Sequence, residues 1–85
     1  MKNITIDCAR IPDKAAMHRA LAQALNFPAW YGNNLDALYD CLTDIEEDTV
    51  LTLLSFDMPG SFRAGFKAVL EDAENDNPHL IVNLR

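Results

Sequence analysis

The chain has 85 residues, of which 49% are hydrophobic, so we expect one folded domain over residues 1–85 rather than a disordered segment. Thirteen acidic residues outnumber seven basic ones, and the formal net charge is −6. This excess argues against direct binding of DNA or RNA, because neutralising the phosphates requires clustered cations. It favours a basic protein partner, whose approach the negative field would accelerate.

The N-terminal segment M-K-N-I-T-I-D has neither the long apolar run nor the small-residue cleavage site of a signal peptide. No stretch of the chain approaches the roughly 20 apolar residues of a membrane span. Cys8 and Cys41 are too few for a disulfide framework, and a free cysteine is commonly a small buried residue. We therefore expect a cytoplasmic protein with reduced thiols and no contact with a membrane.

The first half of the chain contains one strand signal and two helix signals. Asp13 stands where a helix N-cap belongs, and either Asn33 or Asn34 can cap the next helix. Alternation predicts the strand, and apolar side chains at helical spacing predict the first helix. The predicted elements are a strand at 2–8, a helix at 14–25, a loop at 26–33 and a helix at roughly 34–44.

In the second half, residues 49–56 read T-V-L-T-L-L-S-F, which predicts a strand buried on both faces. A turn is expected at 57–60. Apolar side chains then recur with the helical period over residues 62–73, and the Asn-Pro pair at 77–78 ends that helix. Residues 79–84 form the last predicted strand. The order β-α-α-β-α-β indicates an α/β protein with a small three-stranded parallel β-sheet packed against helices.

The predicted second helix has two different faces when residues 35–45 are projected at 100° per residue. Its apolar face is expected to be buried, so the opposite face must lie in water. Asp36 and Asp40 lie four residues apart there and repel each other mildly. No Lys or Arg occurs between Arg19 and Arg63 to neutralise them. The solvent-exposed face consists of Asp36, Tyr39, Asp40 and Thr43.

A solvated helix face is the ordinary explanation for such a pair of carboxylates. Three aromatic rings within ten residues, Trp30, Tyr31 and Tyr39, point instead to a protein interface, where Tyr and Trp are enriched. The combination of aromatic rings with unneutralised carboxylates indicates a surface that binds the cations of another molecule.

The segment from Trp30 to Asp40, W-Y-G-N-N-L-D-A-L-Y-D, resembles the signature of the barstar family of small cytoplasmic proteins that inhibit a bacterial ribonuclease. The family pattern is aromatic-Tyr-Gly-x-Asn-Leu-Asp-Ala-Leu-aromatic-Asp, and the segment matches it throughout. The predicted element order is also similar to the family fold. The resemblance implies a barstar-like domain that plugs the active-site cleft of a basic ribonuclease, one to one, as a monomer in its free form.

The resemblance further implies that Asp40 lies where an RNA phosphate would lie, facing Arg and His side chains of the enzyme. Asp72, on the last helix, takes the place of a family glutamate. Inhibition of this kind requires no cofactor and no catalytic residue. The contact residues implied by matching positions are Trp30, Tyr31, Gly32, Asn34, Asp36, Tyr39, Asp40, Thr43 and Asp72.

The chain departs from the family's prototype at several of these positions. Trp30 replaces a Tyr, Tyr39 replaces a Trp and Asn33 replaces a Glu, while Asp44 and Ile45 stand where the prototype has Gly-Trp. Specificity is a difference of affinities, so such changes can alter the choice of partner. A barstar-like binding module for a basic protein that is not a nuclease therefore remains the alternative interpretation.

A third interpretation is an enzyme that uses Asp36 and Asp40 as acid and base. No nucleophile, metal-ligand set or phosphate loop accompanies these carboxylates, which argues against it. Two carboxylates also make a poor cation site, so no metal is expected. We expect His18 to be partly buried and hydrogen-bonded to a neighbouring loop, and His79 to be exposed.

Overall fold

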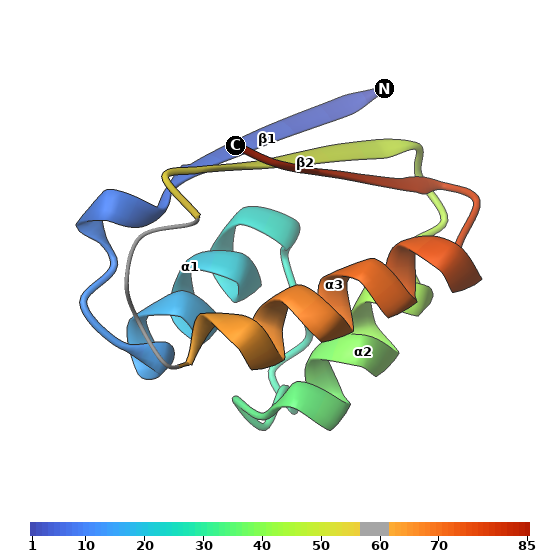
Figure 1. Cartoon of the computed structure of the whole chain (residues 1–85). Coiled ribbons are helices and arrows are strands. Elements are labelled where there is room, and N and C mark those ends of the chain that lie inside the picture. The colour runs from blue at the N-terminus through green and yellow to red at the C-terminus, as the bar shows by residue number, and fades with distance from the viewer. Residues whose placement is uncertain (57–61) are drawn as a thin grey trace.

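The structure is a computed structural model that describes residues 1–56 and 62–85, so the turn predicted at 57–60 lies outside the described residues. The predicted order β-α-α-β-α-β is confirmed, with a short 3-10 helix after the first strand (Figure 1). The elements are β1 (Lys2–Asp7), η1 (Cys8–Arg10), α1 (Lys14–Leu25), α2 (Leu35–Thr43), β2 (Thr49–Leu54), α3 (Arg63–Asp76) and β3 (Leu80–Leu84).

Two helices begin at side chains that satisfy free backbone N–H groups. The Asp13 carboxylate accepts a hydrogen bond from the Ala16 N–H at 2.8 Å, and the Asn34 side-chain oxygen accepts one from the Ala37 N–H at 2.7 Å. Helix α1 ends at Asn26, which adopts the left-handed conformation with φ 57°. The Asn34 cap places the start of α2 immediately after the loop that carries Trp30 and Tyr31, which we call the aromatic loop.

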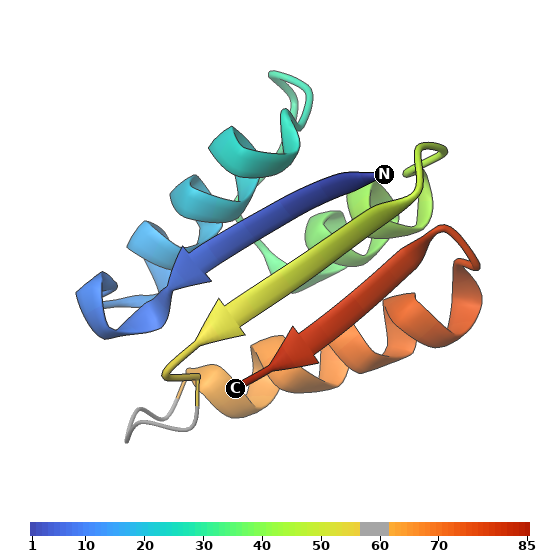
Figure 2. The same ribbon diagram turned by 90° about the horizontal axis from the view of Figure 1, so that it is seen from above.

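The sheet is parallel with strand order β1-β2-β3, and all three helices cover the same face of it (Figures 1 and 2). Burial along β2 therefore alternates, and the prediction that β2 is buried on both faces is wrong. Leu54 is 38% exposed, and Ile81 on β3 is 45% exposed. The long apolar run that suggested two-sided burial includes outward β-branched residues such as Val50, which strands favour even where they face solvent.

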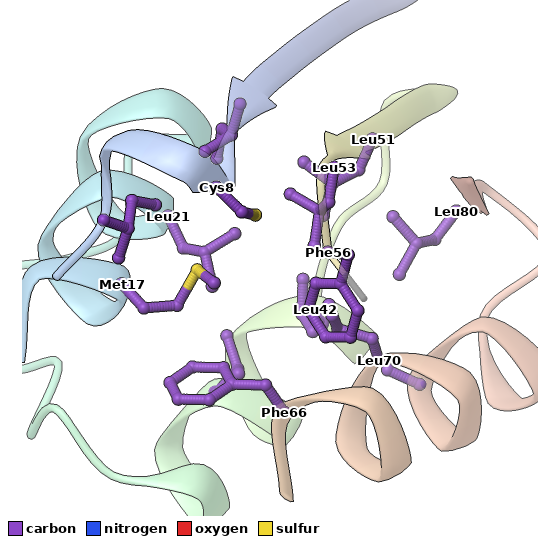
Figure 3. Packing of buried hydrophobic residues seen from close by; sticks show 14 residues of the cluster. Cys8, Met17, Leu21, Leu42, Leu51, Leu53, Phe56, Phe66, Leu70 and Leu80 are labelled. Atoms are coloured by element: carbon purple, nitrogen blue, oxygen red, sulfur yellow. The ribbon is translucent and has the colours of Figure 1, made fainter. Parts of the chain in front are cut away.

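The hydrophobic core lies between the sheet and the helices (Figure 3). Phe66 from α3 and Met17 from α1 are among its largest buried side chains. Cys8 and Cys41 are both buried and free, as predicted from the sequence. In the described part of the chain, no helix has the length and apolar character needed to cross a membrane.

Helix α2 packs chiefly alongside α3, and the two helices approach closely near their N-terminal ends. A Cβ atom added at Gly65 would lie 3.0 Å from Leu35 Cδ1, so a larger residue would require the end of the Leu35 side chain to shift by a few tenths of an ångström. The glycine is unfavourable for α3 by about 1 kcal/mol relative to alanine. Its lack of a side chain leaves room for the Leu35 side chain where α2 meets α3.

Candidate protein-binding surface

Asp36 and Asp40 lie on the outer face of α2, and both are exposed. The opposite face of the helix buries Leu38 and Leu42 completely, which fixes the rotation of α2 about its axis. Among the described residues, the ion pairs are Asp7 with Arg10 and Asp48 with His79, so neither Asp36 nor Asp40 has an internal counter-ion there. The two carboxylates are therefore available to a partner.

Helix α3 adds two further carboxylates beside these. The Tyr39 hydroxyl donates a hydrogen bond to the Asp76 carboxylate, which joins α2 to α3. This hydrogen bond, followed by partial burial and the charges of Asp76, Asp72 and Asp40, raises the pKa of Tyr39 above its usual 10. Asp72 and Asp40 thus lie close enough to Tyr39 to act on it. We call the surface formed by Asp36, Asp40, Asp72 and Asp76 the acidic face.

The aromatic loop presents one ring to solvent and buries part of another. Trp30 is 63% exposed, whereas Tyr31 is half-buried and its hydroxyl is hydrogen-bonded to Nδ1 of His18. Burial raises the pKa of Tyr31 to about 12. His18 is only 4% exposed and packs on the Phe66 ring, with 4.8 Å between centroids. The predicted hydrogen bond between His18 and a neighbouring loop is confirmed, and it anchors the loop to α1.

Several residues implied as contacts have internal hydrogen bonds in the free protein. Asn34 caps α2, and its amide nitrogen donates to the Gly32 carbonyl at 3.4 Å. A Cβ added at Gly32 would lie 3.0 Å from that same nitrogen, so the glycine keeps space for it. The Thr43 hydroxyl donates to the Tyr39 carbonyl at 2.9 Å. These hydrogen bonds hold the loop and helix in place, and Gly32 and Asn34 are exposed to solvent as Trp30, Asp36 and Asp40 are.

The C-terminal end of α2 is held by Asn77, which is only 3% exposed. The side-chain nitrogen of Asn77 donates to the carbonyls of Leu42 and Ile45, at 2.8 and 3.0 Å. Beside this end of the helix lies a groove of about 230 Å³, which we call the Trp30 groove. Its apolar lining includes Phe27, Pro28, Trp30 and Ile45, and Asp44 supplies a carboxylate.

The structure places Asp40 and Asp72 near Tyr39 at the α2–α3 contact, with Asp36 one turn earlier on α2 and Trp30 and Tyr31 in the adjoining loop. Sequence reasoning missed Asp76, which lies one helical turn after Asp72 and could have been found from that spacing. It also missed the role of Asn77, because a buried amide bonded to a distant helix leaves no local pattern. Within residues 1–56 and 62–85, no three His, Cys, Asp or Glu side chains are grouped to hold a metal ion.

Comparison with known proteins shows that residues 1–80 match the family described as Barstar (barnase inhibitor). The chain belongs to the barstar family. A curated relative from Bacillus subtilis (strain 168), named "Putative ribonuclease inhibitor YrdF", is 32% identical over 81 residues, which cover 89% of each chain. The barstar match spans the whole of β1 through the start of β3, so it includes the aromatic loop, α2 and α3. The description of the family is that of an inhibitor of barnase.

Proposed function

We propose that this barstar-family protein inhibits a basic bacterial ribonuclease by binding one to one across its active-site cleft. The observation that carries the proposal is the exposed pair Asp36 and Asp40, which has no internal counter-ion among the described residues of a chain in this family. The contact residues we propose are those implied by the sequence, with Asp76 added. They are Trp30, Tyr31, Gly32, Asn34, Asp36, Tyr39, Asp40, Thr43, Asp72 and Asp76.

Carboxylates on a fixed helix can replace phosphate oxygens in a cationic cleft. An Asp side chain offers two oxygens to an Arg guanidinium, as a phosphate does, and the paired geometry makes the hydrogen bonds strong. The net charge of −6 accelerates the encounter with a basic enzyme, and this effect falls as salt is added. Blocking the cleft is sufficient for inhibition, so the protein itself carries out no reaction.

The proposal is tested by titrating purified protein against a panel of microbial ribonucleases that includes barnase. Asp40→Ala should weaken inhibition of the susceptible enzyme by about 2–5 kcal/mol, chiefly through faster dissociation, because the enzyme's cations would be left buried without a partner. Asp36→Ala should weaken it in the same direction. Glu47→Ala removes an equal charge from an exposed loop position and should change the inhibition constant little.

Unchanged inhibition by both Asp36→Ala and Asp40→Ala would contradict the proposal. Inhibition of none of the ribonucleases would favour the alternative, a basic partner that is not a nuclease. The altered positions Asp44 and Ile45 motivate that alternative, because they change the surface beside the acidic face. Affinity capture from the host with wild-type and Asp40→Ala baits, read by mass spectrometry, distinguishes the two: a ribonuclease retained only by wild-type protein supports inhibition.

We further propose that the protein acts in the cytoplasm as a monomer when free. Two buried thiols without a disulfide are the usual state of cysteines in that compartment. Gel filtration with light scattering across a range of protein concentrations checks the monomer, and a mass near 9.5 kDa is the expected result.

A further inference from the structure

The Trp30 groove lies beside the acidic face but is a separate recess with its own charge. Its volume of about 230 Å³ is below the roughly 300–1,000 Å³ typical of small-molecule sites, so it is suited to one side chain of a partner. Trp30 lines it with an indole ring that is otherwise in solvent. Pro28 and Ile45 add apolar surface against which a hydrocarbon stem can pack.

The groove is negative as well as apolar. Asp44 lines it from the C-cap position of α2, where the helix dipole adds partial negative charge, and the last turn of α2 contains no basic residue. Asp40 lies one turn earlier on the same helix. Burial first, and then the charges of Asp44 and Asp40, raise the pKa of the Cys41 thiol in the groove wall, so both carboxylates act on this recess.

We propose that the Trp30 groove receives an arginine side chain of the partner, whose stem packs on the apolar wall and whose guanidinium stacks on Trp30 and pairs with Asp44. This inference rests on the proposed function and extends it to a second cation-binding position, apart from the acidic face. Arginine suits the groove better than lysine because its planar guanidinium can stack on an indole and also offer paired donors to a carboxylate.

The charge complementarity also decides against other occupants. A purely apolar side chain would cover Asp44 without supplying a hydrogen-bond donor, which is unfavourable for a carboxylate losing water. An acidic side chain would meet Asp44, Asp40 and the negative end of α2. The basic partner required by the proposed function supplies the one class of long side chain that satisfies both the apolar wall and the carboxylate.

The test uses the fact that Trp30 is the single tryptophan of the chain, so its indole N–H gives one resonance that reports on the groove. The full chain, labelled with ¹⁵N, is titrated with N-acetyl-argininamide and, separately, with the uncharged analogue N-acetyl-citrullinamide. We expect a saturable shift of the Trp30 resonance with the arginine probe and a much smaller one with the citrulline probe. In Asp44→Asn the shift at a fixed probe concentration should fall by roughly threefold, whereas Glu47→Gln should match wild type.

Equal shifts with the two probes, or an unchanged response in Asp44→Asn, would overturn the groove proposal. A second measurement uses whichever ribonuclease the protein inhibits: Asp44→Asn and Trp30→Ala should weaken inhibition by more than Glu47→Gln does. If inhibition is intact and insensitive to Asp44→Asn, the groove proposal fails while the proposed function stands. If the arginine probe binds as expected but no ribonuclease is inhibited, the proposed function fails and the groove remains a site for a basic side chain.

Discussion

Tyr39 is the residue that joins the two helices of the acidic face. Its ring packs on the edge of the core from α2, and its hydroxyl donates to Asp76 on α3. A tryptophan at this position, as in the family's prototype, has no phenol to donate in the same way. The ring is therefore held in place before any partner arrives, which limits the conformational entropy lost on binding.

The hydrogen bond between Tyr39 and Asp76 gives a prediction about ionisation. Asp76→Asn should lower the pKa of Tyr39 toward 10, because it removes a nearby negative charge and replaces a charged hydrogen-bond acceptor, which favours the neutral phenol, with a weaker neutral one. The resonance of the tyrosine Cζ carbon, followed against pH, measures the change. Glu71→Gln on the same helix is the control, and a pKa of Tyr39 that is the same in Asp76→Asn as in wild type would contradict the assigned hydrogen bond.

The exposure of Asp36 and Asp40 could be predicted from the sequence because it follows from the helical period and the apolar positions of one element. The pairing of Tyr39 with Asp76 could not, since the two residues are 37 positions apart and meet only when α2 and α3 pack. Local periodicity shows which face of a helix is exposed to solvent. It does not show which other helix contributes side chains to the same surface.

At the scale of elements, Asn77 fixes the C-terminal end of α2. It ends α3, and its side chain bonds two carbonyls at the end of α2 and accepts from the His79 N–H at 2.9 Å. A proline follows it in the sequence, so the same short segment stops α3 and holds α2. The position of Asp44, and with it the Trp30 groove, depends on this contact.

We predict that Asn77→Ala lowers the free energy of unfolding by about 1–3 kcal/mol, because two carbonyls at the end of α2 lose their buried donor. Urea denaturation followed by circular dichroism measures the loss. Asn75→Ala, at an exposed position of the same helix, is the matched control and should be neutral within about 0.5 kcal/mol. Equal stability of the two variants would show that the Asn77 bonds contribute little.

The ends of the helices could be predicted from the sequence where a side chain caps the helix or a proline stops it. Asp13 and Asn34 cap their helices as the sequence indicated, and the Asn-Pro pair at 77–78 ends α3. The two-sided burial of β2 was predicted wrongly because a continuous run of apolar and β-branched residues does not show how many layers cover a sheet. That number depends on where the three helices pack, which is a property of the whole chain.

At the scale of the whole molecule, His18 makes stability depend on pH. Burial, and then the charge of Lys14, lower the pKa of His18 below 6.5 in the folded protein. The unfolded chain therefore binds a proton at this histidine more readily than the folded protein does. The contribution of His18 to the free energy of unfolding is fully present above about pH 6.5 and is lost as the pH drops below it. Unfolding in urea should show a lower midpoint at pH 5.5 than at pH 7.

This pH dependence has a matched control within the chain. His18→Asn should remove most of the change between pH 7 and 5.5, whereas Gln23→Asn, at an exposed position of the same helix, should retain it. Both variants are compared by the difference between their own midpoints at the two pH values, which cancels any constant loss of stability. A wild-type midpoint that does not change over this range would contradict the assignment of a neutral buried imidazole.

The uncovered face of the sheet has a practical consequence for handling the protein. Thr5 on the edge strand β1 points away from the helices and is exposed, whereas both native thiols are buried, Cys8 in the core and Cys41 in the wall of the Trp30 groove. A cysteine introduced at this position would be the reactive thiol through which a dye or a sensor chip is attached. The molecule would then be oriented with its helices, and every surface proposed here for recognition, turned toward the solution.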